Sequence, residues 1–215
     1  MKLLSVNIGH AQSLENAKES GKTGIFKVPS QEPVQITRLG AQGDVICDTA
    51  NHGGVDQAIY IYGTTDYRWW SSILGRELSA GTFGENLTID KLESAYYSIG
   101  DRLHIGNVIL EITAPRIPCV TLATRMEDPA FARRFREAER PGLYCRVIQE
   151  GTVEAGDSVS VEYCDGETVT ILEMFRDFYK SNLSAATLRR YLAAPIAIRD
   201  RVDKEEQLRK MTASV

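Results

Sequence analysis

Between residues 1 and 163, short segments rich in Val, Ile, Thr and Tyr alternate between hydrophobic and polar positions with a period of two. This alternation is typical of strands that bury one face, and glycines separate the segments. Gly106-Asn107 lies between two of them and suits a two-residue hairpin turn. Many short strands with glycine-containing turns predict an all-β barrel or sandwich. The clearest strands are residues 34–39, 102–105, 108–113 and 158–163.

Two helices are expected to interrupt this β region. The first starts at Thr65, a suitable N-cap residue, and stops at Gly75. The second starts at Asp128-Pro129, where an N-cap acid precedes a proline at the first helical position, and ends at Pro141-Gly142. We expect the first helix to pack on the barrel rather than to stack on a ligand. Its packing residues are Tyr67, Trp69 and Trp70, while Phe131 and Phe135 share one face of the second helix.

The hydrophobic period becomes helical after Asp165-Gly166. Thr170 and Glu173 form a capping box at the start of one helix, and Ser184 caps a second. A third helix is expected over residues 198–211. Each is near or below the length at which an isolated helix is stable in water, so the three must pack together or on the β region. We therefore expect two domains, a mainly β barrel domain over residues 1–165 and a three-helix domain over residues 168–215.

Composition narrows the classes of partner. The chain has 215 residues, and its 25 basic and 29 acidic side chains give a net charge of −4. With 43% hydrophobic and 25% charged residues it resembles an ordinary globular protein. No basic block suits a phosphate backbone, and no apolar run reaches the roughly 18 residues that a membrane helix needs. The apolar stretch at the start of the chain is also too short for that of a signal peptide. We expect a cytoplasmic protein that binds neither nucleic acid nor membranes.

Among the four cysteines, Cys119 has the most informative position. It follows a predicted strand, precedes a segment that can begin a helix, and lies three residues after Arg116. A helix N-terminus and a nearby guanidinium both favour a thiolate, so Cys119 is a candidate nucleophile or soft-metal ligand. The cysteines are far apart and form no C-x-x-C pair, which excludes the usual zinc and iron–sulfur patterns. The remaining cysteines, Cys47, Cys145 and Cys164, are expected to be small buried hydrophobic residues.

Two glycine-containing loops before strands carry further candidates. His52-Gly53-Gly54 allows close approach of a ligand to the backbone, although a tight turn with a locally bonded histidine explains it equally well. In the second loop, residues 81–88, Glu85 and Asn86 place polar groups at the mouth of a strand. We expect the other histidines, His10 and His104, to be structural or exposed.

Six segments together resemble a known family. They are GIFKVP at 24–29, LGAQGD at 39–44, HGGVDQA at 52–58, FGENL at 83–87, GDRL at 100–103 and PRIPC at 115–119. In this order they are similar to the MOSC domain, which is related to the C-terminal part of molybdenum-cofactor sulfurase. The three C-terminal helices resemble the helical appendix of the YiiM-like branch of that family. The segment 16–20 matches the family poorly.

The resemblance implies a MOSC-type β-barrel that binds the molybdenum cofactor, molybdopterin. Cys119 matches the cysteine that is the molybdenum ligand or carries sulfur. Lys27 and Arg116 match basic positions suited to the pterin and its phosphate, and Lys22 is a further candidate. The remaining residues expected at this cofactor site, on motif loops at the same mouth, are His52, Gly53, Glu85 and Asn86.

Known relatives with these motifs include reductases of N-hydroxylated compounds such as N-hydroxylated purine bases, so we expect that activity. The reaction consumes two electrons, and the sequence shows no flavin, nicotinamide or iron–sulfur signature. A separate reductase must therefore supply them. Two alternatives remain open: a sulfur carrier with a persulfide on Cys119, and a carrier of the cofactor. The C-terminal helices are expected to shape the substrate pocket or contact the electron donor, and a homodimer is left open.

Overall fold

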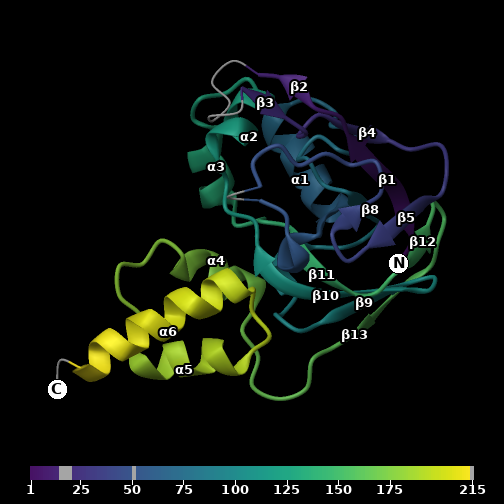
Figure 1. The fold of residues 1–215 in the computed structure, drawn as a ribbon. Helices are drawn as coiled ribbons and strands as arrows, with labels where there is room; N and C mark the ends of the chain where they lie inside the picture. The colour runs from purple at the N-terminus through teal and green to yellow at the C-terminus, as the bar shows by residue number, and fades with distance from the viewer. Residues whose placement is uncertain (15–20, 50–51, 214–215) are drawn as a thin grey trace.

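A computed structural model describes residues 1–14, 21–49 and 52–213 of the protein. Its main feature is an eight-stranded sheet with the order β13-β9-β10-β11-β7-β8-β1-β4 (Figure 1). The strands are β1 (Leu3–Gly9), β4 (Lys27–Pro29), β7 (Ile59–Gly63), β8 (Leu87–Ile89), β9 (Arg102–Ile105), β10 (Val108–Pro115), β11 (Leu143–Gln149) and β13 (Val159–Glu162). A three-stranded sheet joins β12 (Gly151–Val153), β5 (Val34–Thr37) and β6 (Gly40–Ala41), and a two-stranded one joins β2 (Gln12–Ser13) to β3 (Lys22–Thr23).

The sheet-rich fold agrees with the prediction, but the expected closed barrel does not form. The edge strands β13 and β4 are not paired with each other, so the sheet is open. An isolated bridge between Lys2 and Ser158 brings the start of β1 to the start of β13. Backbone hydrogen bonds from the Gly156-Asp157 turn to Leu3 support this bridge. The contact stays limited to the start of β1, whose far end pairs with β4 at Asn7–Gly9.

Four of the predicted strands occur close to their expected positions, as β5, β9, β10 and β13. The hairpin at Gly106-Asn107 is also present, since Ile105 pairs with Val108 in the antiparallel ladder of β9 and β10. Residues Leu103, Leu110 and Ile112 from these strands are fully buried. The period-two pattern therefore identified the core-facing side of the sheet.

Helix α1 (Thr64–Leu74) connects β7 to β8, which lie side by side in parallel and therefore need a crossover connection. The helix ends at Gly75, whose φ of 64° is the left-handed conformation that glycine adopts readily. Its N-cap is Gly63 instead of the predicted Thr65, because the helix already starts at Thr64, so the cap lies two residues earlier. As predicted, Tyr67 and Trp70 are buried against the sheet side, and Trp69 packs on the same cluster of aromatic residues.

Helices α2 (Val120–Arg125) and α3 (Phe131–Ala138) cover the same aromatic cluster. The predicted face of Phe131 and Phe135 is fully buried. The predicted start at Asp128-Pro129 is displaced: these residues form a turn, and the Asp128 carboxylate accepts the Ala130 N–H, so the helix begins at Phe131. A 3₁₀ turn, η1 (Val55–Gln57), precedes β7, and a second one, η2 (Ser94–Tyr96), follows β8.

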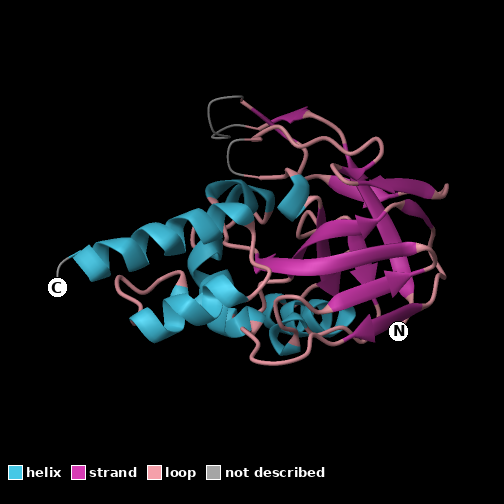
Figure 2. Cartoon of the chain, turned by 60° about the horizontal axis from the view of Figure 1, so that its bottom comes forward, coloured by secondary structure: helices cyan, strands magenta, loops and turns pink. Residues whose placement is uncertain are grey.

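The three C-terminal helices are α4 (Ile171–Asp177), α5 (Ala185–Ala193) and α6 (Ile198–Ala213). Thr170 and Ser184 cap α4 and α5 as predicted, each accepting a backbone N–H through its side chain. In Figure 2 the helices gather on one side of the molecule and the strands on the other. Val169, Ile171 and Tyr191 belong to the same hydrophobic core as the sheet. The division into two domains therefore stays a prediction, while the core that joins the two segments is continuous.

Candidate functional site

A cavity opens at the starts of β4 and β7, with the loops that precede them, and at the end of β10, with the loop that follows it. Its empty volume is about 650 Å³ when the open solvent at its mouth is included. Most of the predicted site residues line it: Lys22, Lys27, His52, Gly53, Asn86, Arg116 and Cys119. Residues that are distant in sequence therefore meet in one cavity. Glu85 is the predicted residue that does not reach this wall.

Cys119 is the N-cap of α2, directly after the loop that leaves β10, as the sequence predicted. Burial of the thiol raises its pKa, but three interactions outweigh this effect. The His52 side chain is hydrogen-bonded to the thiol, the charge of Arg116 is close, and the backbone N–H of Leu122 also contributes. Together they lower the pKa of Cys119 to about 6. At neutral pH the residue is therefore mostly a thiolate, the form that acts as nucleophile and as metal ligand.

His52 connects this thiol to a carboxylate. Its Nδ1 lies 3.5 Å from Oδ2 of Asp48, and its backbone N–H donates to the Asp48 carbonyl at 3.0 Å. His52 thus forms a locally bonded tight turn and also contacts the reactive thiol, so both interpretations of this loop apply. A carboxylate, an imidazole and a thiol in series resemble the arrangement that activates nucleophilic cysteines. Gly53 follows with a φ of 74°, which favours glycine, and its backbone forms part of the cavity wall.

Lys27 is not a free cation at the cavity wall. Both carboxylate oxygens of Asp44 accept hydrogen bonds from its Nζ. The side chain of Lys27 is only 8% exposed and that of Asp44 only 6%. Asp44 also accepts the Gly9 N–H at 2.7 Å and the Asn86 amide at 2.9 Å. Burial lowers the pKa of Lys27 more than Asp44 raises it. Much of the Lys27 charge is therefore balanced within the protein, and the ion pair has a structural role in addition to any contact with a ligand.

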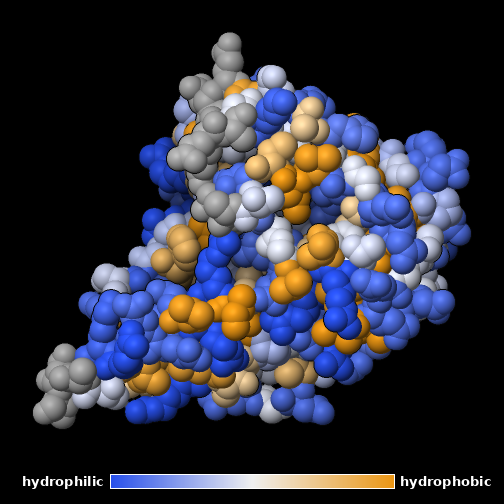
Figure 3. Space-filling view, viewed as in Figure 1, coloured by the Kyte–Doolittle hydropathy of each residue, from blue (hydrophilic) through white to orange (hydrophobic). Residues whose placement is uncertain are grey.

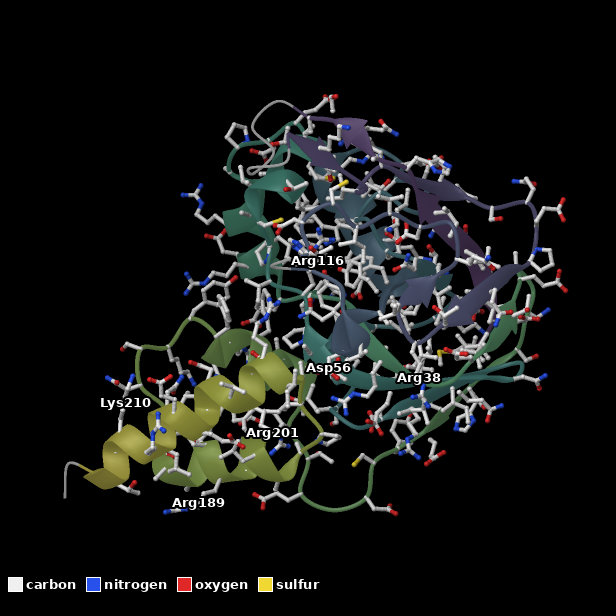
Figure 4. All side chains as sticks on the ribbon, viewed as in Figure 1. Arg38, Asp56, Arg116, Arg189, Arg201 and Lys210 are labelled. Carbon is white, nitrogen blue, oxygen red and sulfur yellow. The ribbon has the colours of Figure 1, made fainter. Side chains whose placement is uncertain are left out.

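Arg116 has a different environment. Its Nη1 donates to the carbonyl of Phe83, and its guanidinium lies 5.0 Å from the centroid of the Tyr60 ring. Across the described part of the chain no carboxylate forms an ion pair with Arg116, and its buried Nε has no hydrogen-bond partner. Figure 4 shows Arg116 near the centre of the molecule, away from the helical arm that α4, α5 and α6 form. An arginine is always charged, so the cavity contains a buried cation with an unused donor.

Two of the predicted site residues are mainly structural. Asn86 uses both side-chain groups, since its Oδ1 accepts the Tyr60 N–H and its Nδ2 donates to Asp44. Glu85 is fully buried, and its Oε1 accepts from Tyr67, Gly81 and Thr88. Burial raises the pKa of Glu85, and its Oε2 has no hydrogen-bond partner. The glutamate stabilises the loop behind the cavity instead of contacting its contents.

A second cavity lies between the end of β10 and the C-terminal helices, with an empty volume of about 1100 Å³ including open solvent. It shares His52, Gln57, Cys119 and Tyr144 with the first cavity. In Figure 3 the surface is recessed between the helical arm and the rest of the chain. Residues of the helical segment line this cavity, namely Met174, Asp177, Phe178, Tyr191, Arg199, Asp200 and Lys204. Cys119 therefore lies at the boundary of two cavities, one on each side.

The other cysteines differ in position. Cys145 is fully buried within β11, and burial raises its pKa, as expected for a core residue. Cys164 is partly exposed and lies outside both cavities. Cys47 departs from the expectation of a buried residue, because it is only partly buried and lines the first cavity. His104 contacts Glu162 at 2.8 Å on the sheet surface, in agreement with a structural role.

Sequence analysis missed several residues of the site. Asp44 and Asp48 lie in loops that the motif comparison covered or adjoined, but their partners could not be read from the sequence. Tyr60 and Tyr144 have the appearance of ordinary strand residues, and only the pairing of β7 with β11 brings their rings to a centroid distance of 5.0 Å at the cavity. Gln57 had no distinguishing signal.

The donor set suits an anionic cofactor that carries its own metal ligands. Within the described ranges, no group of three or more His, Cys, Asp or Glu side chains could hold a metal ion alone. A single thiolate beside an arginine with an unused donor instead fits a metal whose other ligands come from a bound cofactor. The residues present therefore fit molybdopterin, which supplies sulfur ligands and an anionic phosphate.

Comparison with known proteins identifies the family. The family model of the MOSC domain matches residues 48–160, and the chain belongs to this family. The uncharacterized protein YflK of Bacillus subtilis (strain 168) is 35% identical over 159 residues, which cover 74% of this chain and 72% of YflK. Protein YiiM of Escherichia coli (strain K12) is 28% identical over 155 residues, or 71% of this chain and 68% of that protein.

Two further similarities are informative. A protein named Reductase from Gibberella moniliformis (strain M3125 / FGSC 7600) is 30% identical over 143 residues, which cover 65% of this chain but only 25% of that protein. The crystal structure of YiiM from Geobacillus stearothermophilus has the same fold, with a TM-score of 0.78 and 24% identity, covering 96% of this chain and 98% of that one. The predicted resemblance to the MOSC family and its YiiM-like branch is thus confirmed. Among the described helices, none is both long and apolar enough to cross a membrane.

Proposed function

We propose that this protein binds the molybdenum cofactor in the first cavity and reduces N-hydroxylated compounds, with electrons from a separate reductase. The observation that carries the proposal is the Cys119 thiolate at the boundary of the two cavities. A cofactor held on the cationic side and a substrate held on the helical side would meet at this residue. Membership of the MOSC family and the relative named Reductase support the same assignment.

Different residues of the first cavity would bind different parts of the cofactor. Cys119 would ligate the metal through its sulfur, and the guanidinium of Arg116, which also lines the cavity, would donate to an anionic oxygen of the cofactor. Lys27 and Lys22 add positive charge at the same wall, and Lys27 also keeps Asp44 in place. When bound, the cofactor supplies the two-electron chemistry that removes oxygen from nitrogen. The protein's part is to bind and orient both partners and to keep the thiol ionised.

His52 would act on both the thiol and the substrate. Its hydrogen bond to Cys119 stabilises the thiolate, and its contact with Asp48 orients the imidazole. His52 also lines the second cavity, so the proton of the N–H that it shares with the thiol is close enough to pass to a leaving oxygen of a substrate. N–O reduction consumes protons as well as electrons, so a proton donor at this position suits the reaction.

A second function is favoured by the same three residues. Asp48, His52 and Cys119 form a series that would activate the thiol without any cofactor. Such a thiolate could attack the outer sulfur of a donor persulfide, release the donor thiolate and pass the sulfur on in the same way. A sulfur carrier, or a protein that only carries the cofactor, is therefore the alternative to the reductase.

Elemental and pterin analysis of freshly purified protein tests the proposal. A reductase should contain stoichiometric molybdenum and release a fluorescent pterin after oxidation, and it should reduce an N-hydroxylated purine base when a chemical or protein electron donor is supplied. Cys119→Ser should lose molybdenum, while Cys164→Ser, outside both cavities, should retain it. Persulfide on Cys119 without molybdenum would support the sulfur carrier, and molybdenum without turnover would support the cofactor carrier.

A further inference from the structure

The second cavity has a wall that the proposed cofactor site does not use. Its far side consists of residues from α4, α5 and α6, while its near side contains Cys119 and His52. Apolar and aromatic side chains form much of this far wall, including Met174, Phe178 and Tyr191. Such a surface suits a flat organic molecule. The polar groups on the same wall would orient such a molecule.

Two of the charged residues on this wall already have partners. Asp177 accepts the Tyr191 hydroxyl at 3.1 Å and pairs with Lys180 at 2.6 Å. Lys204 pairs with Asp203 at 3.2 Å and lies 5.9 Å from the centroid of the Tyr191 ring. These groups hold the helices together. Their hydrogen-bonding capacity is therefore partly used before any ligand arrives.

Asp200, in the first turn of α6, differs from them. Within residues 1–14, 21–49 and 52–213, no hydrogen bond or ion pair engages its carboxylate, although the side chain lines the cavity. Burial raises the pKa of Asp200 more than the charge of Lys204 lowers it. The carboxylate oxygens of Asp200 are only partly buried and are accessible from the cavity, so a ligand that supplies an N–H would form a charge-assisted hydrogen bond there in place of water.

The first turn of α6 is fixed to the sheet, so the position of Asp200 is defined. Asp56 accepts the Ile198 N–H at 2.7 Å and pairs with Arg146 of β11 at 3.0 Å. Arg146 in turn donates to the carbonyls of Pro195 and Ile196. Figure 4 shows Asp56 at the end of the sheet that faces the helical arm. This clamp holds Asp200 on the wall opposite the reactive thiol.

We propose that the second cavity is the substrate site and that Asp200 determines specificity by accepting an N–H of a flat, uncharged or cationic nitrogen compound whose N-hydroxylated end lies at Cys119. The inference rests on the proposed function, because it assigns Asp200 as a residue that recognises the substrate of that reaction. Aminopurine bases belong to this class, and so do other heterocycles with an N–H donor. Asp200 does not touch the reacting atoms and acts by recognition of the remainder of the molecule.

Binding of adenine, the product expected from an N-hydroxylated adenine, tests the inference without any turnover. Titration calorimetry on the purified protein should detect adenine binding, and Asp200→Asn should weaken it about tenfold, as expected for loss of one charged hydrogen bond. Glu205→Gln is the matched control, because Glu205 lies on the same helix, is exposed and does not line the cavity. This control should bind adenine as the unmodified protein does.

The kinetic pattern provides the second readout. In molybdenum-loaded protein, Asp200→Asn should raise KM for an N-hydroxylated purine while kcat changes little, because the substitution removes ground-state binding. Unchanged adenine affinity in Asp200→Asn, or no adenine binding to an active reductase, would overturn the assignment of Asp200. Adenine binding that depends on Asp200 in a protein without molybdenum would instead refute the reductase and leave the ligand site standing.

Discussion

The His52 side chain is hydrogen-bonded to the sulfur of Cys119, at the boundary shared by the two cavities. One residue comes from the loop before β7 and the other from the loop after β10. Their contact lowers the pKa of the thiol and orients the imidazole toward both cavities. The reactivity of the site therefore depends on the packing of these two loops against each other.

The first prediction concerns the pH dependence of thiol alkylation in the cofactor-free protein. Only the thiolate reacts, so the rate at Cys119 should fall as the pH decreases through about 6, the pKa of its thiol. In His52→Gln the pKa should rise, and alkylation at pH 7 should slow several-fold. Mass spectrometry of iodoacetamide-treated protein measures both rates. Burial and nearby carboxylates raise the pKa of Cys164, so it serves as an internal control that reacts only at alkaline pH. A midpoint near 9 at Cys119 would contradict the prediction.

The second prediction concerns the Lys27–Asp44 ion pair. Lys27→Gln leaves Asp44 buried without its cation and should reduce the free energy of unfolding by about 3 to 5 kcal/mol. The double variant Lys27→Gln with Asp44→Asn should recover much of this loss, because no uncompensated charge remains. Urea unfolding of the single and double variants in the cofactor-free protein measures the coupling. Additive effects of the two substitutions would show that the pair is not coupled as described.

The third prediction concerns Arg116. Because no carboxylate in the described ranges pairs with it, Arg116→Gln should weaken cofactor binding by roughly 1.5 to 3 kcal/mol, the value of a charged hydrogen bond. Retention of molybdenum and pterin during dialysis measures this loss. Arg38→Gln, on a distant part of the sheet side in Figure 4, is the control and should retain cofactor normally. Equal retention by the two variants would remove Arg116 from the cofactor site.

The fourth prediction concerns the continuity of the core. Tyr191 of α5 is fully buried in the core that includes the sheet, so Tyr191→Ala should cost about 3 to 5 kcal/mol of unfolding free energy. The fluorescence of Trp69 and Trp70, which belong to α1, should report the same shifted transition as helical circular dichroism. Tyr163→Ala, at a residue that is 69% exposed, should change little. A tryptophan transition unaffected by Tyr191→Ala would support two independently folding domains.

The sequence alone determined the local elements and the membership of the family. Period-two alternation located strands such as β10, and the side chains of Thr170 and Ser184 began helices where expected, because these signals act within a few residues. The motif order indicated the MOSC family and the place of Cys119 before a helix. It also identified Lys22, Lys27, Arg116 and His52 as neighbours of that thiol, although their roles remain predictions.

Only the tertiary structure decided how these residues are connected. The edge strands β13 and β4 do not pair, so the sheet stays open, and no local pattern encodes such long-range pairing. Spatial proximity alone gives Lys27 its partner Asp44 and turns Asn86 toward the protein interior. The same is true of Asp200, which has the appearance of an ordinary helix acid in the sequence. Its role depends on Asp56 and Arg146, which fix the start of α6 opposite the thiol because Asp56 accepts the Ile198 N–H and Arg146 donates to the Pro195 and Ile196 carbonyls.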